Sequence, residues 1–153
     1  GWSNRWPITT KPGYSELAAY FNLDNGTGKI RGIYAENNPG VVPIFREWLS
    51  PFSGMGATTV AIQKTGGTDH VFLQAVGLQG FQFIQDPLDY STRTHHTNLD
   101  TFDHLKGDDL RQASVIIASF LLNAANADKA LPKPPLPTKP VVTDPYAYPD
   151  DDD

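Results

Sequence analysis

Strand-like and helix-like segments alternate along residues 14–126, and this order limits the chain to a small group of architectures. Apolar and β-branched runs typical of strands cover residues 19–25, 29–35, 57–63 and 80–85. Helical patterns cover residues 14–19, 40–49, 69–76 and 110–126. Because the two kinds of segment alternate without an internal repeat, we expect an α/β fold with a mixed, mostly parallel sheet and helices on both faces.

Residues with special backbone preferences mark the ends of these segments. Gly26 and Gly28 flank a turn between the first two strands, which predicts that those strands pair as a hairpin. Pro43 fits the second helix only in its first turn, since an interior proline would break the helix. Thr68 is a candidate cap for the third helix, and Pro87 stops the fourth strand.

The strongest helical pattern covers residues 110–126. Ile116 and Phe120 widen its apolar face, so we expect this helix to be largely buried. The residues that define the face are Leu110, Ala113, Ile117, Leu121 and Ala124. A long polar loop, residues 86–107, precedes the helix, and loops of this length tend to be functional.

Composition divides the chain into three parts. Residues 1–13 are rich in Trp, Pro and Gly and are expected to be an extended lead-in. Residues 14–130 hold all the strand and helix patterns and form the expected domain. Residues 131–153 are rich in proline and end in four aspartates, so we expect an extended or disordered tail.

The overall balance of residue types excludes several classes of function. Hydrophobic residues make up 39% and charged residues 19%, with a net charge of −5, which suits a soluble globular domain. No basic patch with interleaved aromatics occurs, which argues against a nucleic-acid partner. No apolar run reaches the roughly 18 residues of a membrane span. The chain has no cysteine, which excludes disulfides, thiolate nucleophiles and cysteine zinc sites.

Two potential metal ligands stand at informative places. Asp24 lies at the end of the strand predicted over residues 19–25, and His96 lies in the long loop after the fourth strand. Ligand sites in α/β sheets lie at the carboxyl ends of strands, and both residue types bind zinc. Each residue also has a simpler interpretation: Asp24 as part of a common turn, and His96, like His95, as a solvated loop histidine.

Three sequence motifs carry a resemblance to a known family. Residues 22–34 (NLDNGTGKIRGIY), 66–90 (GGTDHVFLQAVGLQGFQFIQDPLDY) and 92–105 (TRTHHTNLDTFDHL) resemble the C-terminal half of the M28 family of zinc peptidases. The family includes aminopeptidases, carboxypeptidase Q-like enzymes and the related glutaminyl cyclases. The motifs occur in the family's order over roughly residues 1–137, and they imply a partial zinc-peptidase/phosphorylase-like fold.

The resemblance implies a site with two zinc ions held by five ligands. In chain order the family uses a His, a bridging Asp, a Glu, an Asp and a His, with a further Glu as the general base. Asp24 matches the fourth ligand and His96 the fifth. The first three ligands and the base belong upstream of Asp24, where this sequence has no His or Asp and only Glu16. The chain alone is therefore expected to be inactive, since a zinc site needs about three protein ligands.

The resemblance also assigns surrounding residues. Asp69 and His70 match an Asp-His pair that lies close to the metal or the substrate pocket, although Asp69 could instead cap the third helix. Asp100 is expected to fix the loop that carries His96, through backbone amides or the imidazole. Gly66 and Gly67 would let the backbone approach a substrate, or form a plain turn.

Three functions remain open at this point. The first is part of a dizinc exopeptidase that cleaves terminal peptide bonds, completed by a missing N-terminal half or a neighbouring subunit. The second is a non-catalytic structural or assembly subunit derived from a peptidase half. The third is a glutaminyl cyclase-like acyltransferase. The family resemblance implies a peptide substrate and a secreted or periplasmic location.

Overall fold

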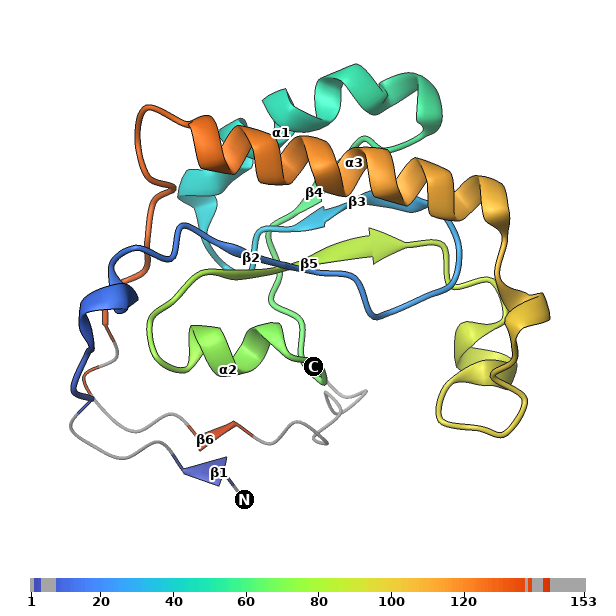
Figure 1. Ribbon diagram of the computed structural model, residues 1–153, viewed down its shortest axis with the longest axis horizontal. Coiled ribbons are helices and arrows are strands. Elements are labelled where there is room, and N and C mark those ends of the chain that lie inside the picture. The colour runs from blue at the N-terminus through green and yellow to red at the C-terminus, as the bar shows by residue number, and fades with distance from the viewer. Residues whose placement is uncertain (1, 4–7, 137, 139–141, 144–153) are drawn as a thin grey trace.

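The computed structural model describes residues 2–3, 8–136, 138 and 142–143 (Figure 1). A four-stranded sheet forms its centre, and the three α-helices cover both faces. The strands of this sheet are β2 (Tyr20–Asn22), β3 (Ile30–Tyr34), β4 (Thr59–Ala61) and β5 (Gly80–Gln85). The helices are α1 (Val42–Leu49), α2 (His70–Gln74) and α3 (Gly107–Asn126). The mixed α/β fold expected from the sequence is confirmed.

The strand order in the sheet is β2-β5-β3-β4. β5 pairs parallel with β2 and antiparallel with β3, while β3 pairs parallel with β4. The predicted hairpin between β2 and β3 is therefore wrong, because β5 lies between them. The turn packs against the chain after β5 instead: Gly28 N donates to the carbonyl oxygen of Asp86 over 2.9 Å. The turn residues correctly indicated that the chain reverses direction between β2 and β3. They could not show that β5, a later strand, lies between the two in the sheet.

α1 and α3 lie on one face of the sheet and α2 on the other (Figure 1). The core between the sheet and helices α1 and α3 is aromatic, with Phe45 and Phe120 fully buried. α1 starts after a 3-10 turn at Pro39–Val41 and holds Pro43 in its first turn, as predicted. The prediction of a helix over residues 14–19 is wrong: only the 3-10 turn Pro12–Tyr14 forms, because the chain enters β2 after a few residues, too few to sustain a helix.

α3 buries only part of the apolar face that its sequence pattern predicts. Its buried residues are Gln112, Ala113, Ile116 and Phe120. Leu110 and Leu121 are 44% and 52% exposed, so the expectation of a largely buried helix is wrong. The buried face also includes Gln112: its Nε2 donates to the Ile30 carbonyl oxygen over 2.8 Å, and its Oε1 accepts from Ile30 N over 2.9 Å. The buried polar side chain thus satisfies both backbone groups of Ile30 at an irregular point of β3.

The lead-in and the tail are described only in part. β1 (Trp2–Ser3) pairs antiparallel with β6 (Val142–Thr143). Leu131 belongs to the core cluster, and Gln79 Nε2 donates to its carbonyl oxygen over 2.9 Å. The start of the expected tail is therefore packed on the domain, whereas most of residues 137–153 lie outside the described part of the chain. In that part, no helix is long and apolar enough to cross a membrane.

Close packing of β3 against β4 gives a sharp stability prediction at Gly32. A Cβ at this position would lie 1.9 Å from the carbonyl oxygen of Thr59, which no real structure tolerates. We expect Gly32→Ala to lower the free energy of unfolding by about 2 kcal/mol or more, measured by urea denaturation. Gly54→Ala is the matched control, since nothing lies within 4 Å of its Cβ. Equal stability of the two variants would contradict the described strand packing.

Candidate functional site

Asp24 follows β2 at the carboxyl edge of the sheet. Its Oδ2 accepts a hydrogen bond from Thr68 Oγ1 over 2.7 Å, and its backbone carbonyl oxygen accepts one from the Tyr90 hydroxyl over 3.0 Å. The residue is exposed. Because β2 and β5 are parallel neighbours, Asp24 and the loop after β5 leave the sheet at the same edge. The sheet topology thus brings together the two segments singled out in the sequence.

A buried polar network holds the Thr68 side chain that donates to Asp24. Asn22 Nδ2 donates to Thr68 Oγ1 and to Gln82 Oε1, both over 2.6 Å. The Tyr20 hydroxyl donates to Asn22 Oδ1 over 3.1 Å. Asn22, Thr68 and Gln82 are all less than 8% exposed. The Thr68 hydroxyl is therefore held in one orientation: it accepts from Asn22 and donates to Asp24.

Asp69 lies beside this network at the start of α2. Burial raises the pKa of Tyr20, and the negative charges of Asp69 and Asp24 raise it further, so the phenol stays protonated as a donor.

Asp69 makes no side-chain capping bond to α2, although its backbone holds the cap position. The prediction that the Thr68 side chain caps α2 is wrong, because its hydroxyl is directed to Asp24 instead.

His96 lies in a compact turn on the same edge. The π-helical turn Tyr90–Thr94 precedes it, and the His95 ring stacks on Tyr90 with the ring centroids 4.6 Å apart. The rings of His95 and His96 are 3.9 Å apart, and His96 has a positive φ of 57°. A continuous series of contacts thus leads from the Asp24 carbonyl through Tyr90 and His95 to the exposed ring of His96.

Other groups hold this loop in place. Asp89 Oδ2 lies 2.6 Å from His104 Nδ1, which ties the start of the turn to the 3-10 helix Phe102–His104. The Thr97 hydroxyl donates to the carbonyl oxygen of Arg93 over 2.7 Å. In the described part of the chain these bonds do not involve the Asp100 side chain, whose expected role stays a prediction. The sequence analysis missed the Asp89–His104 pair.

The loop between β4 and α2 contains Gly66 and Gly67, both exposed. Gly67 has a φ of 75°, a conformation that favours glycine, and nothing lies within 4 Å of a Cβ placed on Gly66. The backbone here is open to solvent. This geometry is compatible with approach by a substrate and equally with a simple turn.

A buried acid–histidine pair joins the start of α2 to the chain after β3. His70 is fully buried, and its Nε2 lies 3.3 Å from Glu36 Oε1, whose side chain is 2% exposed. Glu36 Oε1 also accepts from Thr65 Oγ1 over 2.5 Å. Sequence reasoning missed Glu36, although it follows β3 as Asp24 follows β2. That position after a strand was the available signal.

The Glu36 carboxylate gives a pH prediction. Burial alone would raise its pKa, but hydrogen bonds from His70, Thr65 and Gln74 outweigh burial, so the pKa lies below the usual 4.5. A lowered pKa in the folded state adds stability above the usual pKa, and that stability is lost as the pH falls through the folded-state value. We therefore expect the stability advantage of the wild type over Glu36→Gln to shrink as the pH falls below the usual carboxyl pKa of 4.5, measured by urea denaturation over the acidic range. A constant difference over this range would contradict the prediction.

Zinc chemistry needs more ligands than these residues supply. Among the residues that the structure describes, no group of three or more His, Cys, Asp or Glu side chains could hold a metal ion. Asp24 offers a carboxylate already oriented by Thr68, which suits a metal ligand. Asp24 and His96 together still fall short of the usual three protein ligands. The described donor set is therefore incomplete as a zinc site.

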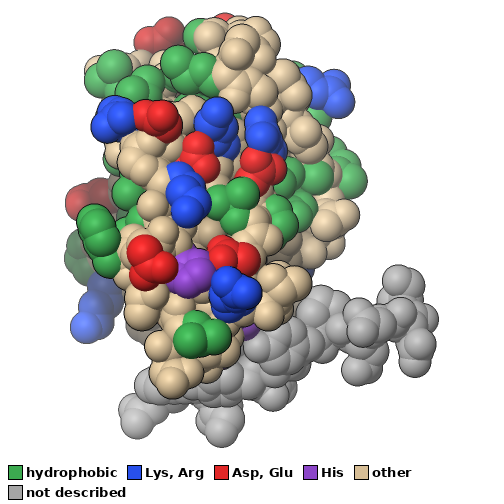
Figure 2. All heavy atoms as spheres, turned by 90° about the vertical axis from the view of Figure 1, so that its right-hand side faces the viewer, with side chains coloured by type: hydrophobic (Ala, Val, Ile, Leu, Met, Phe, Trp, Pro, Cys, Tyr) green, Lys and Arg blue, Asp and Glu red, His purple; other side chains and the backbone are tan. Residues whose placement is uncertain are grey.

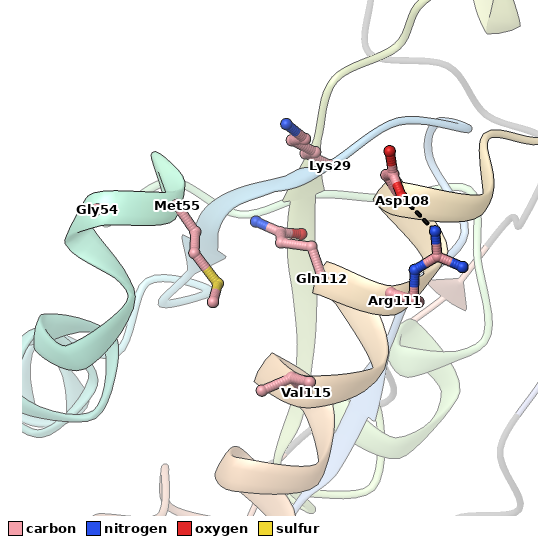
Figure 3. Close-up of a pocket in the computed structure, with 7 residues that line it drawn as sticks. All are labelled: Lys29, Gly54, Met55, Asp108, Arg111, Gln112 and Val115. Atoms are coloured by element: carbon pink, nitrogen blue, oxygen red, sulfur yellow. Dashed lines mark hydrogen bonds and ion pairs between the residues drawn. The ribbon is translucent and has the colours of Figure 1, made fainter.

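A separate pocket of about 420 Å³ lies between the start of β3, the 3-10 helix Ser50–Met55 and the first turns of α3 (Figure 3). Arg111 and Asp108 pair across part of its rim. The full lining consists of Lys29, Gly54, Met55, Asp108, Arg111, Gln112 and Val115. It includes none of the predicted site residues. On the side of the molecule that lies to the right in Figure 1, acidic and basic side chains are interleaved (Figure 2).

Comparison with known proteins identifies the family. A mixed sheet with a carboxylate and histidines at the carboxyl edge of parallel strands is typical of α/β enzymes that bind ligands at that edge. The sequence model of Peptidase family M28 matches residues 4–121, so the chain belongs to this family. Peptidases of this family are generally zinc-dependent.

One solved structure is similar over most of this chain. The crystal structure of the Peptidase M28 precursor from Shewanella amazonensis aligns with a TM-score of 0.65 and 28% identity. The match covers 83% of this chain but only 29% of that one, so the chain spans less than a third of its neighbour's length. No curated protein matches.

Proposed function

We propose that this chain is part of the catalytic domain of a dizinc exopeptidase, in which Asp24 and His96 each bind a zinc ion. One observation carries the proposal: consecutive contacts join Asp24, Tyr90, His95 and His96 at one edge of the sheet. When bound, the two zinc ions would polarise the scissile carbonyl and lower the pKa of a water molecule. The remaining ligands and the general base come from residues outside the printed sequence.

In this proposal the described residues act by orientation. Thr68 holds one carboxylate oxygen of Asp24, and Tyr90 ties the histidine loop to the backbone beside it. Among the described residues the ligand set is incomplete, so we expect the chain alone to be inactive as a peptidase. We further propose a periplasmic or extracellular location for the intact protein, which is what the family resemblance implies.

A second proposal is a non-catalytic assembly subunit. Two observations favour it: the described residues hold no complete metal-binding group, and α3 exposes apolar side chains. Val115, Leu121 and Leu122 are 51%, 52% and 65% exposed. Exposed apolar side chains and the edge strands β2 and β4 offer surface to a partner. Both proposals therefore predict a further protein segment against this domain.

Metal content and peptide hydrolysis of the natural gene product distinguish the two. For the exopeptidase we expect about two zinc ions per particle, together with release of terminal residues from short peptides. A zinc chelator should abolish that release, and added zinc should restore it. Absence of both zinc and hydrolysis would overturn the exopeptidase proposal and support the assembly subunit.

A further inference from the structure

Glu36 is the centre of a buried hydrogen-bond cluster that joins three segments of the chain. Its Oε2 accepts from Thr65 N over 2.9 Å and from Gln74 Nε2 over 3.1 Å. Its Oε1 accepts from the Thr65 hydroxyl and lies beside His70 Nε2. Both carboxylate oxygens of Glu36 thus have hydrogen-bond partners. Burying a charged side chain that is only 2% exposed would be costly without these bonds.

The hydrogen positions in this cluster follow from its chemistry. The Thr65 hydroxyl donates to Glu36, so the His70 Nε2, 3.0 Å from that hydroxyl oxygen, must carry the hydrogen between them. His70 Nδ1 is buried and has no hydrogen-bond partner among the described residues. Among the described residues, His70 therefore joins the cluster through Nε2 alone, which faces the Thr65 hydroxyl and the Glu36 carboxylate. The cluster holds the loop before α2 rather than forming part of a wider histidine network.

The backbone around Glu36 is also constrained. Glu36 and Asn37 have positive φ values of 53° and 57°, which residues with side chains rarely adopt. Ala35 N and Asn37 N each donate over 2.7 Å to carbonyl oxygens of the β4 segment. Such conformations persist only where the surroundings impose them, and they gather at functional sites. The unfavourable backbone conformation of Glu36 therefore occurs at a residue whose carboxylate is fixed by several hydrogen bonds.

The held loop leads directly to the candidate site. Only two residues, Gly66 and Gly67, separate Thr65 from Thr68, whose hydroxyl donates to Asp24. Two successive exposed glycines would leave this loop free to move, so its course depends on anchors at both ends. Glu36 provides the anchor at Thr65, and α2 provides the anchor at His70.

We propose that Glu36 is a positioning residue for Asp24: by fixing Thr65 it sets the loop so that the Thr68 hydroxyl orients the Asp24 carboxylate. The link to metal binding rests on the proposed function, whereas the link from Glu36 to Thr68 and Asp24 does not. The competing interpretation is that the cluster only stabilises α2. The two differ in what happens at Asp24 when the cluster is weakened.

Paired variants in the natural gene product test the proposal. Thr65→Val and Thr68→Val remove one hydroxyl each, and the matched Thr65→Ser and Thr68→Ser keep it. Glu36→Gln keeps the shape but places an NH2 group where an acceptor stood, and Glu47→Gln repeats that change on the exposed surface of α1. Removing groups that orient metal ligands typically costs 10–100-fold in affinity.

The first readout is zinc affinity, measured by competition with a chromophoric chelator. We expect about a tenfold loss or more for Glu36→Gln, Thr65→Val and Thr68→Val, and values close to wild type for both serine variants and Glu47→Gln. The double variant Glu36→Gln/Thr68→Val should lose little more than Thr68→Val alone, since both act through the same hydroxyl. Additive losses, or unchanged affinity with only a lower melting temperature, would overturn the proposal.

The second readout is amide hydrogen exchange of the metal-free protein. Glu36→Gln should accelerate exchange in residues 62–69 and also in residues 20–25, which carry Asp24. Exchange changes confined to the α2 region would overturn the proposal. If the gene product binds no zinc but residues 20–25 respond, the exopeptidase proposal fails while the positioning role of Glu36 stands.

Discussion

Replacing Asp24 with alanine in the natural gene product is expected to lower kcat/KM for peptide hydrolysis by about 10³-fold or more. A zinc ion supplies several kcal/mol of transition-state stabilisation, and each 1.36 kcal/mol is about a tenfold change in rate. Zinc content should fall with activity, because the exposed carboxylate that Thr68 orients would be gone. The measurements are steady-state kinetics and metal analysis of the same preparation.

The histidine pair provides an internal control for this prediction. His96→Ala should cause a loss similar to that of Asp24→Ala. His95→Ala removes a ring that packs between Tyr90 and His96 without binding the metal, and it should cost about tenfold at most. Asp128→Ala, on an exposed turn after α3, should leave the kinetics unchanged. If His95→Ala abolished activity and His96→Ala spared it, the assignment of the ligand would be wrong by one residue.

The second large effect is expected at Phe120 in the core. Its ring is fully buried and lies 5.2–5.6 Å, centroid to centroid, from the rings of Phe83, Trp48, Phe45 and Phe21. Phe120→Ala would remove one ring from a cluster that joins α3, α1 and two strands. We expect a loss of about 3–5 kcal/mol in the free energy of unfolding, measured by chemical denaturation.

Phe102→Ala is the matched control, because the same substitution there removes a ring that is 86% exposed. Its effect on stability should stay within about 0.5 kcal/mol. A loss at Phe102 equal to that at Phe120 would mean that a further protein segment covers Phe102. A small loss at Phe120 would contradict the described core.

Local patterns were most accurate where tertiary contacts reinforced them. The strand Gly80–Gln85 has the predicted bounds, because an apolar run with a proline just beyond it leaves few alternatives. The helix predicted over residues 110–126 forms and starts three residues earlier. Its buried face holds the predicted Ala113, Ile116 and Phe120 and also Gln112, which a pattern that counts apolar residues cannot assign to the core.

The candidate site shows a similar division. Asp24 and His96 were visible in the sequence as a carboxylate after a strand and a histidine in a long loop. Glu36, Thr68 and Tyr90 were not assigned to the site, because their roles depend on hydrogen bonds between segments 29 to 66 residues apart. No periodic pattern or motif spacing encodes such bonds.

The sequence by itself determined the α/β class, most of the element positions and the family, because these follow from local periodicity and from short motifs in order. Only the tertiary structure decided that β5 separates β2 from β3 and that Thr68 orients Asp24. Strand pairing and side-chain hydrogen bonds depend on which distant segments meet, and that choice is made by the packing of the whole core.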